Sequence, residues 1–153
     1  SHLAASPNRD EPRLPIRLEV PQLNCAEMKA FGEIERERIM AEDDLFTVIS
    51  DKYPISPGHS LIVVKRGVAR FTELTADERA RLTHWIDWSI ANLQATLKPV
   101  PDGFNVGLND GPAAGQTVGQ LHVHVIPRYR GDVDDPRGGV RWILPTKARY
   151  WKQ

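Results

Sequence analysis

The stretch Gln120-Leu121-His122-Val123-His124-Val125-Ile126 decides how we interpret this chain, because polar and apolar residues alternate along it. A period of two is typical of a β-strand with one apolar face, and we predict a strand over residues 120–127. Gln120, His122 and His124 should then share one face, about 7 Å apart, while the residues between them point into the core. Buried polar side chains need partners. The row therefore predicts a site for an anionic ligand, a metal ion or a covalent intermediate.

The loop directly before this strand strengthens the prediction. Gly115-Gln116-Thr117-Val118-Gly119 offers backbone N–H groups, a carboxamide and a hydroxyl between glycines. Such a loop can wrap a phosphate. The alternative is an ordinary turn capped by Gln116 and Thr117. Beside a row of histidines, the loop favours the phosphate site.

The rest of the chain predicts an α+β fold. Apolar residues at helical spacing predict a long helix over residues 75–97, which Thr75 and Glu78 begin with a capping-box pattern. A shorter apolar spacing predicts a short helix over residues 25–35. Further strands are predicted over residues 37–42, 45–50, 60–65 and 103–108. Most strands are joined by links too short for a helix, so we expect a roughly five-stranded, mainly antiparallel sheet.

Composition excludes several classes of protein. The chain has 153 residues, which fits one domain, and its 20 Lys+Arg balance 20 Asp+Glu. The chain lacks the overall basic excess that is typical of proteins that bind duplex nucleic acid. No apolar run approaches the ~20 residues of a membrane span. The single cysteine, Cys25, excludes an internal disulfide and fits a reducing compartment, so we expect a cytoplasmic protein. Residues 1–22, rich in proline and charge, predict an extended or partly disordered arm.

Several motifs in order resemble the histidine triad (HIT) family, whose signature is H-φ-H-φ-H-φ-φ, with φ apolar. The resemblance lies in Gly115–Val118 followed by Leu121–Arg128, in Pro54–His59 and in Asn109–Pro112. It covers roughly residues 25–132 and is nearest to the branch of the fragile histidine triad and dinucleoside polyphosphate hydrolases. It implies a HIT-like domain over residues 23–132 with one long and one short helix, acting as a homodimer. Residues 133–153 would then form a C-terminal extension that packs on the domain or on the dimer partner.

The resemblance also implies a mechanism. His122 matches the histidine that attacks the α-phosphorus of a nucleotide and forms a nucleotidyl-histidine, and a neutral imidazole is a good nucleophile near pH 7. His124 would bind phosphate oxygens or the leaving group, and His59 would lie against the row. Asp51 matches a position that contacts the ribose. Positions that contact phosphate or bridging oxygens are matched by Asn109, Gln116 and Thr117. The expected substrate is a nucleoside phosphate anhydride or phosphoramidate, with a dinucleoside polyphosphate first, and no cofactor or metal.

Two positions depart from the family pattern. Gln120 replaces the first histidine of the triad, and a glutamine forms hydrogen bonds but cannot titrate. This leaves open a nucleotidyltransferase of the same fold and a catalytically weak nucleotide-binding module, beside the hydrolase. A metal site on His59, His122 and His124 is a third alternative. Met28 stands where some relatives complete a C-x-x-C zinc site with Cys25, so we predict no zinc there.

The C-terminal tail carries a separate hypothesis. Arg137 and Arg141 could reach substrate phosphates, and Trp142 could stack on a base or on a partner protein. The alternative is a surface segment that packs on a second subunit.

Overall fold

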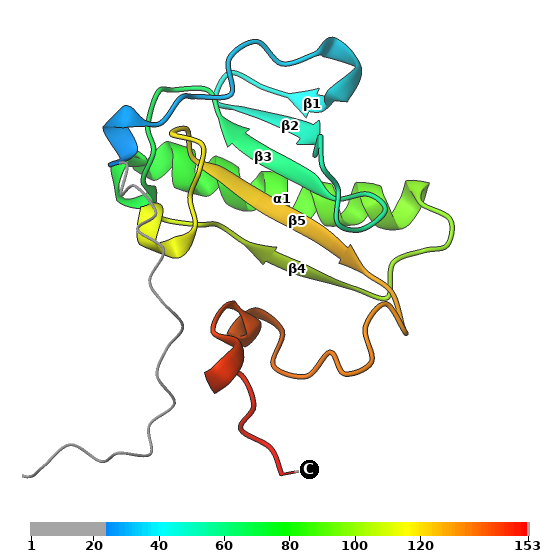
Figure 1. The fold of residues 1–153 in the computed structure, drawn as a ribbon. Helices are drawn as coiled ribbons and strands as arrows, with labels where there is room; N and C mark the ends of the chain where they lie inside the picture. Colours follow the sequence, from blue (N-terminus) through cyan, green and yellow to red (C-terminus); the bar gives the residue numbers. More distant parts are fainter. Residues whose placement is uncertain (1–23, 153) are drawn as a thin grey trace, which may run out of the picture.

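A computed structural model describes residues 24–152, so the predicted N-terminal arm lies outside the described residues. Five strands form one antiparallel sheet in the order β1-β2-β3-β5-β4 (Figure 1). Their bounds are β1 (Ile39–Glu42), β2 (Phe46–Ser50), β3 (Ser60–Val64), β4 (Gly103–Gly107) and β5 (His122–Arg128). The α+β class and the five-stranded sheet are confirmed.

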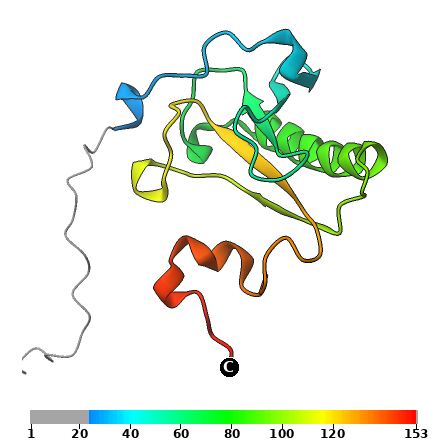
Figure 2. The ribbon, with the colours of Figure 1, turned by 45° about the vertical axis from the view of Figure 1, so that its right-hand side comes forward.

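One face of the sheet is covered by the long helix α1 (Ala76–Thr96), which crosses behind the strands (Figures 1 and 2). The predicted capping box is present: the Thr75 hydroxyl accepts from the Glu78 backbone N–H, and the Glu78 carboxylate accepts from the Thr75 backbone N–H. Glu78 is also buried, and its carboxylate binds Arg66 through two hydrogen bonds. The charge that caps the helix is thus neutralised inside the domain.

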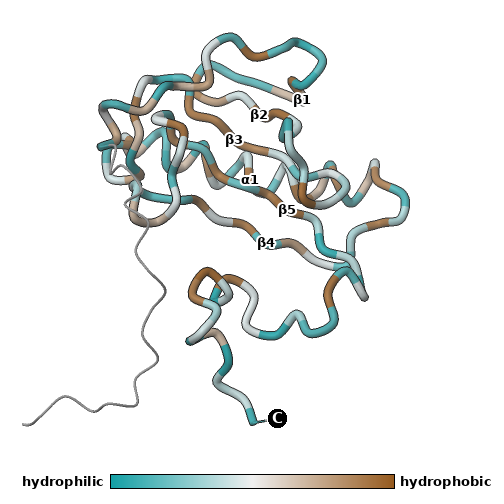
Figure 3. Tube along the Cα trace, in the orientation of Figure 1, coloured by the Kyte–Doolittle hydropathy of each residue, from teal (hydrophilic) through white to brown (hydrophobic). Residues whose placement is uncertain are grey.

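The central strand β3 is buried at every position and carries one of the most hydrophobic stretches of the chain (Figure 3). Ile62 and Val64 pack toward α1, while Leu61 and Val63 form a second cluster on the opposite face. Three apolar residues before β2 pack against this second cluster, namely Phe31, Ile34 and Ile39. The N-terminal part of the described chain therefore covers part of the face that α1 leaves open.

The predicted short helix over residues 25–35 is limited to one 3-10 turn, Cys25–Glu27. The backbone that follows forms hydrogen bonds with the loop before β5. The Lys29 carbonyl accepts from Gly119, and the Phe31 N–H donates to the Gln120 side chain. Gly32 then adopts a φ of 68°, in the left-handed region. These contacts hold the segment extended across the loop that precedes β5.

The structure also moves the start of the strand that was predicted over residues 120–127. β5 begins at His122, so Gln120 precedes the strand and does not continue its alternation. Within β5 the predicted pattern is confirmed, because Val123 and Val125 are buried while His122 and His124 are half-buried on the other face. The row predicted from the sequence thus contains two histidines and not three polar residues.

After β5 the chain folds into two 3-10 helices, η5 (Gly139–Ile143) and η6 (Pro145–Lys147). Arg137 stacks on Trp151, and the Arg141 guanidinium stacks on Tyr150 while donating to the Ala148 carbonyl. This C-terminal segment lies along the side of the sheet formed by β4 and β5 (Figures 1 and 2). Among residues 24–152, no helix combines the length and the hydropathy that crossing a bilayer requires.

Candidate active site

A cavity of about 520 Å³ lies on the sheet face opposite α1. β5 supplies His122 and His124, and β3 supplies Leu61. Loops supply the remaining predicted residues, with Asp51 following β2 and the loops before β5 contributing Asn109 and Thr117. The structure therefore brings five of the eight predicted site residues to one cavity.

The His122 ring is held in one tautomer. Its Nδ1 lies 2.9 Å from the backbone carbonyl oxygen of Gln120. A carbonyl oxygen only accepts, so Nδ1 carries a proton, and in the neutral ring Nε2 keeps its lone pair. Phe31 packs edge-on against the same ring, with 5.0 Å between the ring centroids. The geometry thus presents an imidazole with an unprotonated Nε2 in a cavity.

A hydrogen bond between His59 and His124 fixes the tautomer of His124. The Ile55 backbone N–H donates to His59 Nδ1 over 3.3 Å, so the proton of neutral His59 resides on Nε2. That Nε2 lies 2.9 Å from His124 Nδ1 and donates to it. His124 must then carry its own proton on Nε2. His59, buried behind the cavity, makes His124 a hydrogen-bond donor at Nε2.

Both histidines of this pair are uncharged at neutral pH. Burial lowers the pKa of His124 to about 4, and the neighbouring His122 and His59 act in the same direction. Burial likewise lowers the pKa of His59, although the Asp51 carboxylate, 3.4 Å from His59 Nε2, opposes the shift. A neutral pair is what the tautomer assignment requires, since a doubly protonated ring could not accept.

Among residues 24–152, one group places metal-ligating atoms together. Atoms of Asp51, His59 and His124 lie within 4.8 Å of one another. Coordination through His59 Nε2 would move its proton to Nδ1, where the Ile55 N–H already donates. A metal ion here would therefore disrupt an existing, partly buried hydrogen bond.

Comparison with known proteins assigns the fold. The sequence model of the HIT domain matches residues 32–131. The chain belongs to the HIT domain family. It is 34% identical over 120 residues to an AP-4-A phosphorylase of Mycobacterium tuberculosis, covering 74% of this chain and 60% of that protein. It is 31% identical over 121 residues to the bifunctional bis(5'-adenosyl)-triphosphatase/adenylylsulfatase FHIT of Arabidopsis thaliana, covering 78% of this chain and 66% of that protein.

A solved structure agrees with these matches. The crystal structure of the C. elegans NitFhit protein has a TM-score of 0.63 and 30% identity, and the match covers 76% of this chain and 27% of that one. The family and branch predicted from the sequence are thereby confirmed. The chain spans less than two thirds of the length of several of these relatives. Similarity alone therefore does not assign their activities to this HIT domain.

Gln120 precedes the two histidines of β5, but its side chain forms hydrogen bonds with backbone groups. Its Nε2 donates to the Val64 carbonyl, at the end of β3, and its Oε1 accepts from the Phe31 N–H. The carboxamide thus joins β3 to the segment whose Phe31 ring packs on His122. The contact to His122 comes from the Gln120 backbone and not from its side chain.

Gln116 is likewise turned away from the cavity. It is buried, its Oε1 accepts from the Gly111 N–H over 2.8 Å, and its Nε2 donates to the Ala69 and Val118 carbonyls. These bonds fasten the loop that presents Thr117. The structure therefore turns the Gln116 side chain to the backbone of its own loop and away from the cavity.

Sequence reasoning missed several residues of this cavity. Phe31 was expected on a helix, and its contact with His122 has no signal in the sequence. Two cations also line the cavity, but Arg38 and Lys52 both pair with Glu35. The cavity also offers three neutral donor groups, namely the imidazole of His124, the hydroxyl of Thr117 and the amide of Asn109.

Proposed function

We propose that this HIT domain hydrolyses a nucleoside phosphate anhydride through a nucleotidyl-histidine on His122. The observation that carries the proposal is the His122 tautomer, because the Gln120 carbonyl holds the proton on Nδ1 and leaves the Nε2 lone pair free. Dinucleoside polyphosphates are the first substrate class. The names of the Mycobacterium and Arabidopsis relatives support that class.

The first step forms a bond from His122 Nε2 to the α-phosphorus and breaks the bond to the bridging oxygen. The bond electrons leave with the departing phosphate, and the ring becomes a cation whose Nδ1–H remains bonded to the Gln120 carbonyl. The His124 Nε2–H and the Thr117 hydroxyl would stabilise charge on the phosphoryl oxygens, and both residues line the cavity. In the second step water attacks phosphorus, the P–N bond breaks, and the lone pair returns to Nε2. One proton of the water stays on the released nucleotide, and the other passes to solvent.

The leaving group follows from the state of His124. With its pKa at about 4, His124 is neutral, and giving up its Nε2 proton would leave an imidazolate. A departing phosphate, whose own second pKa is about 6, leaves without a proton. Ammonia from a phosphoramidate needs one. The site therefore favours an anhydride over a phosphoramidate.

We also propose a homodimer in the cytoplasm, as the sequence suggested. Trp85 does not lie on a dimer surface, because it is buried in its own chain and its Nε1 donates to Asp43. β4 is an edge strand of the sheet, and its edge is one candidate for the dimer surface. Sedimentation equilibrium measures the state directly, and a monomer at all concentrations contradicts the proposal.

The test is a paired turnover assay. The parent protein and His122→Ala are incubated with diadenosine tetraphosphate and with adenosine phosphoramidate, and AMP release is followed by chromatography. We expect release by the parent, faster from the anhydride, and none by the variant. Alkaline quenching preserves a phosphorus–nitrogen bond, so mass spectrometry of the peptide containing His122 should detect an added nucleotidyl group.

The same assay separates the alternatives. A nucleotidyl-enzyme that turns over only with phosphate or a sugar phosphate identifies a transferase. Calorimetric AMP binding without turnover or adduct identifies a binding module. A parent protein that neither binds AMP nor cleaves either substrate contradicts the proposed function.

A further inference from the structure

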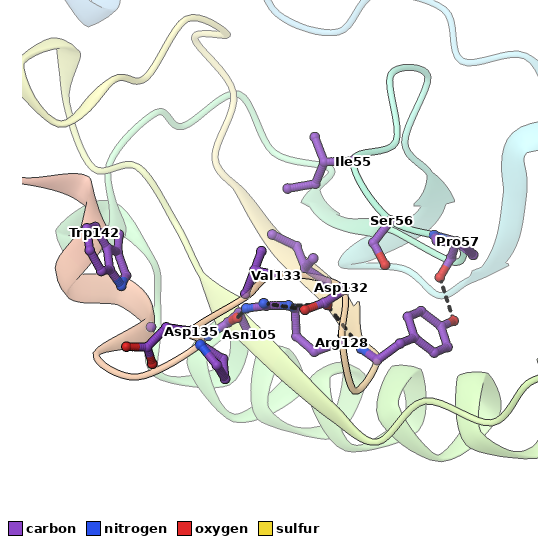
Figure 4. Close-up of a pocket in the computed structure, with 13 residues that line it drawn as sticks. Ile55, Ser56, Pro57, Asn105, Arg128, Asp132, Val133, Asp135 and Trp142 are labelled. Atoms are coloured by element: carbon purple, nitrogen blue, oxygen red, sulfur yellow. Dashed lines mark hydrogen bonds and ion pairs between the residues drawn. The ribbon is translucent and has the colours of Figure 1, made fainter. Parts of the chain in front are cut away.

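A second cavity, of about 560 Å³, lies beside the candidate active site on the same face of the sheet. β4 and β5 form its floor through Asn105, Ile126 and Arg128. Figure 4 shows Ile55 and Pro57 on one side and Trp142 on the other. The C-terminal segment thus builds a wall that the sheet alone would not have.

This cavity continues the active site. Ile126 follows His124 on the same face of β5, so the two side chains stand about 7 Å apart. Ile55, which lines the second cavity, donates its backbone N–H to His59, which in turn holds His124. A group that leaves the phosphorus near His124 would need to extend only a few bonds to reach the second cavity.

The charged side chains that line the second cavity are already paired with one another or with a neighbour. Arg128 binds the Asp132 carboxylate through two hydrogen bonds and donates to Asn105 Oδ1 (Figure 4). Asp135 is held in the same way by Arg137. No cation is left free among these residues to bind a phosphate. The cavity is suited to an uncharged group.

The remaining surface fits a flat ring. The indole of Trp142 lines the cavity together with Ile126 and Val133. Trp142 Nε1 donates to the Arg137 carbonyl, which fixes the indole in place. Asn105 Nδ2 has no hydrogen-bond partner among the described residues and can donate to a ring nitrogen or a carbonyl oxygen. An aromatic wall, apolar contacts and one free donor are what a nucleobase requires.

We infer that the second cavity binds the nucleoside of the leaving half of the substrate, with its base against Trp142. The inference rests on the proposed function, since it assigns the departing nucleotide to this cavity and the transferred one to the cavity of His122. It also replaces the hypothesis that Arg137 and Arg141 reach phosphates. Arg137 is paired with Asp135, and Arg141 donates to two backbone carbonyls.

The test compares two substrates that differ in their leaving group. Diadenosine tetraphosphate releases a nucleotide, whereas adenylyl sulfate releases only sulfate. We expect Trp142→Ala to lower the ratio of kcat/KM for the dinucleotide over adenylyl sulfate by about tenfold, the effect of losing one base-stacking contact. Trp142→Phe keeps an aromatic ring and should retain most of the ratio. Ile143→Ala is the matched control, because Ile143 is the next residue of η5 and is 82% exposed.

A binding arm keeps the inference testable without turnover. In the His122→Ala background, calorimetry gives the dissociation constants of diadenosine tetraphosphate and of AMP. Adding Trp142→Ala should raise the ratio of the first constant to the second by about tenfold. Catalytic and binding ratios that match those of Ile143→Ala overturn the inference and leave the proposed function intact. A His122→Ala protein that binds neither ligand overturns both.

Discussion

Replacing Gln120 by alanine separates two structural roles of this residue. Its backbone carbonyl orients His122, whereas its side chain joins Phe31 to β3. The substitution keeps the carbonyl and removes two side-chain hydrogen bonds. At about 0.5–1.5 kcal/mol each, we expect the free energy of unfolding to fall by about 1–3 kcal/mol. The His122 tautomer survives, so kcat should fall by less than about tenfold, or about 1.4 kcal/mol of barrier.

Urea unfolding and AMP release measure the two effects on the same preparations. Gln94→Ala is the control, since Gln94 is an exposed glutamine of α1, and its stability should change by no more than about 0.5 kcal/mol. His122→Ala defines the activity without a nucleophile. A Gln120→Ala protein as stable as Gln94→Ala but as inactive as His122→Ala would refute this reasoning and make the Gln120 side chain catalytic.

Three further outcomes are expected. The free energy of unfolding should fall by up to about 3 kcal/mol as the pH falls from 6.5 to about 4. In this range His124 binds a proton in the unfolded chain but not in the folded one, because folding lowers its pKa. The His124→Gln variant should lose much of this pH dependence when unfolding is measured across the same range. Gly58→Ala should unfold about 1–3 kcal/mol more easily, since φ is 88° and a Cβ would strike Leu97, whereas Gly131→Ala, at φ 82° in open space, should lose less in the same urea experiment. Gln116→Leu should lower the unfolding temperature and raise KM, and an unchanged temperature would contradict the structural role of that carboxamide.

Alternation and capping made most of the fold predictable. The period of two over residues 121–127 placed His122 and His124 on one face, because β5 is buried on the other by contacts with α1. The T-x-x-E pattern at Thr75 placed the start of α1 one residue later, as a capping box requires. These features depend on local geometry, which the sequence carries directly.

The failures lie where distant segments compete for the same backbone groups. Apolar spacing predicted a helix around Phe31, but Gln120 and Gly119 take up backbone groups of that segment from almost 90 residues away. Gln120 itself fitted the alternation and yet leaves the strand, since its carboxamide finds partners on both sides. The motif around Gln116 predicted the loop but not the direction in which the Gln116 side chain points. Nothing in a local pattern decides which way a glutamine side chain turns.

The hydrogen bonds that run from Ile55 through His59 to His124 have one more consequence. Their innermost member is a peptide N–H, which never gives up its hydrogen, so the series is closed at its inner end. It acts as a fixed dipole that points its positive end at the ligand, and it cannot serve as a proton wire. A proton exchanged by His124 would therefore pass on the cavity side, where the Asp51 carboxylate also lies.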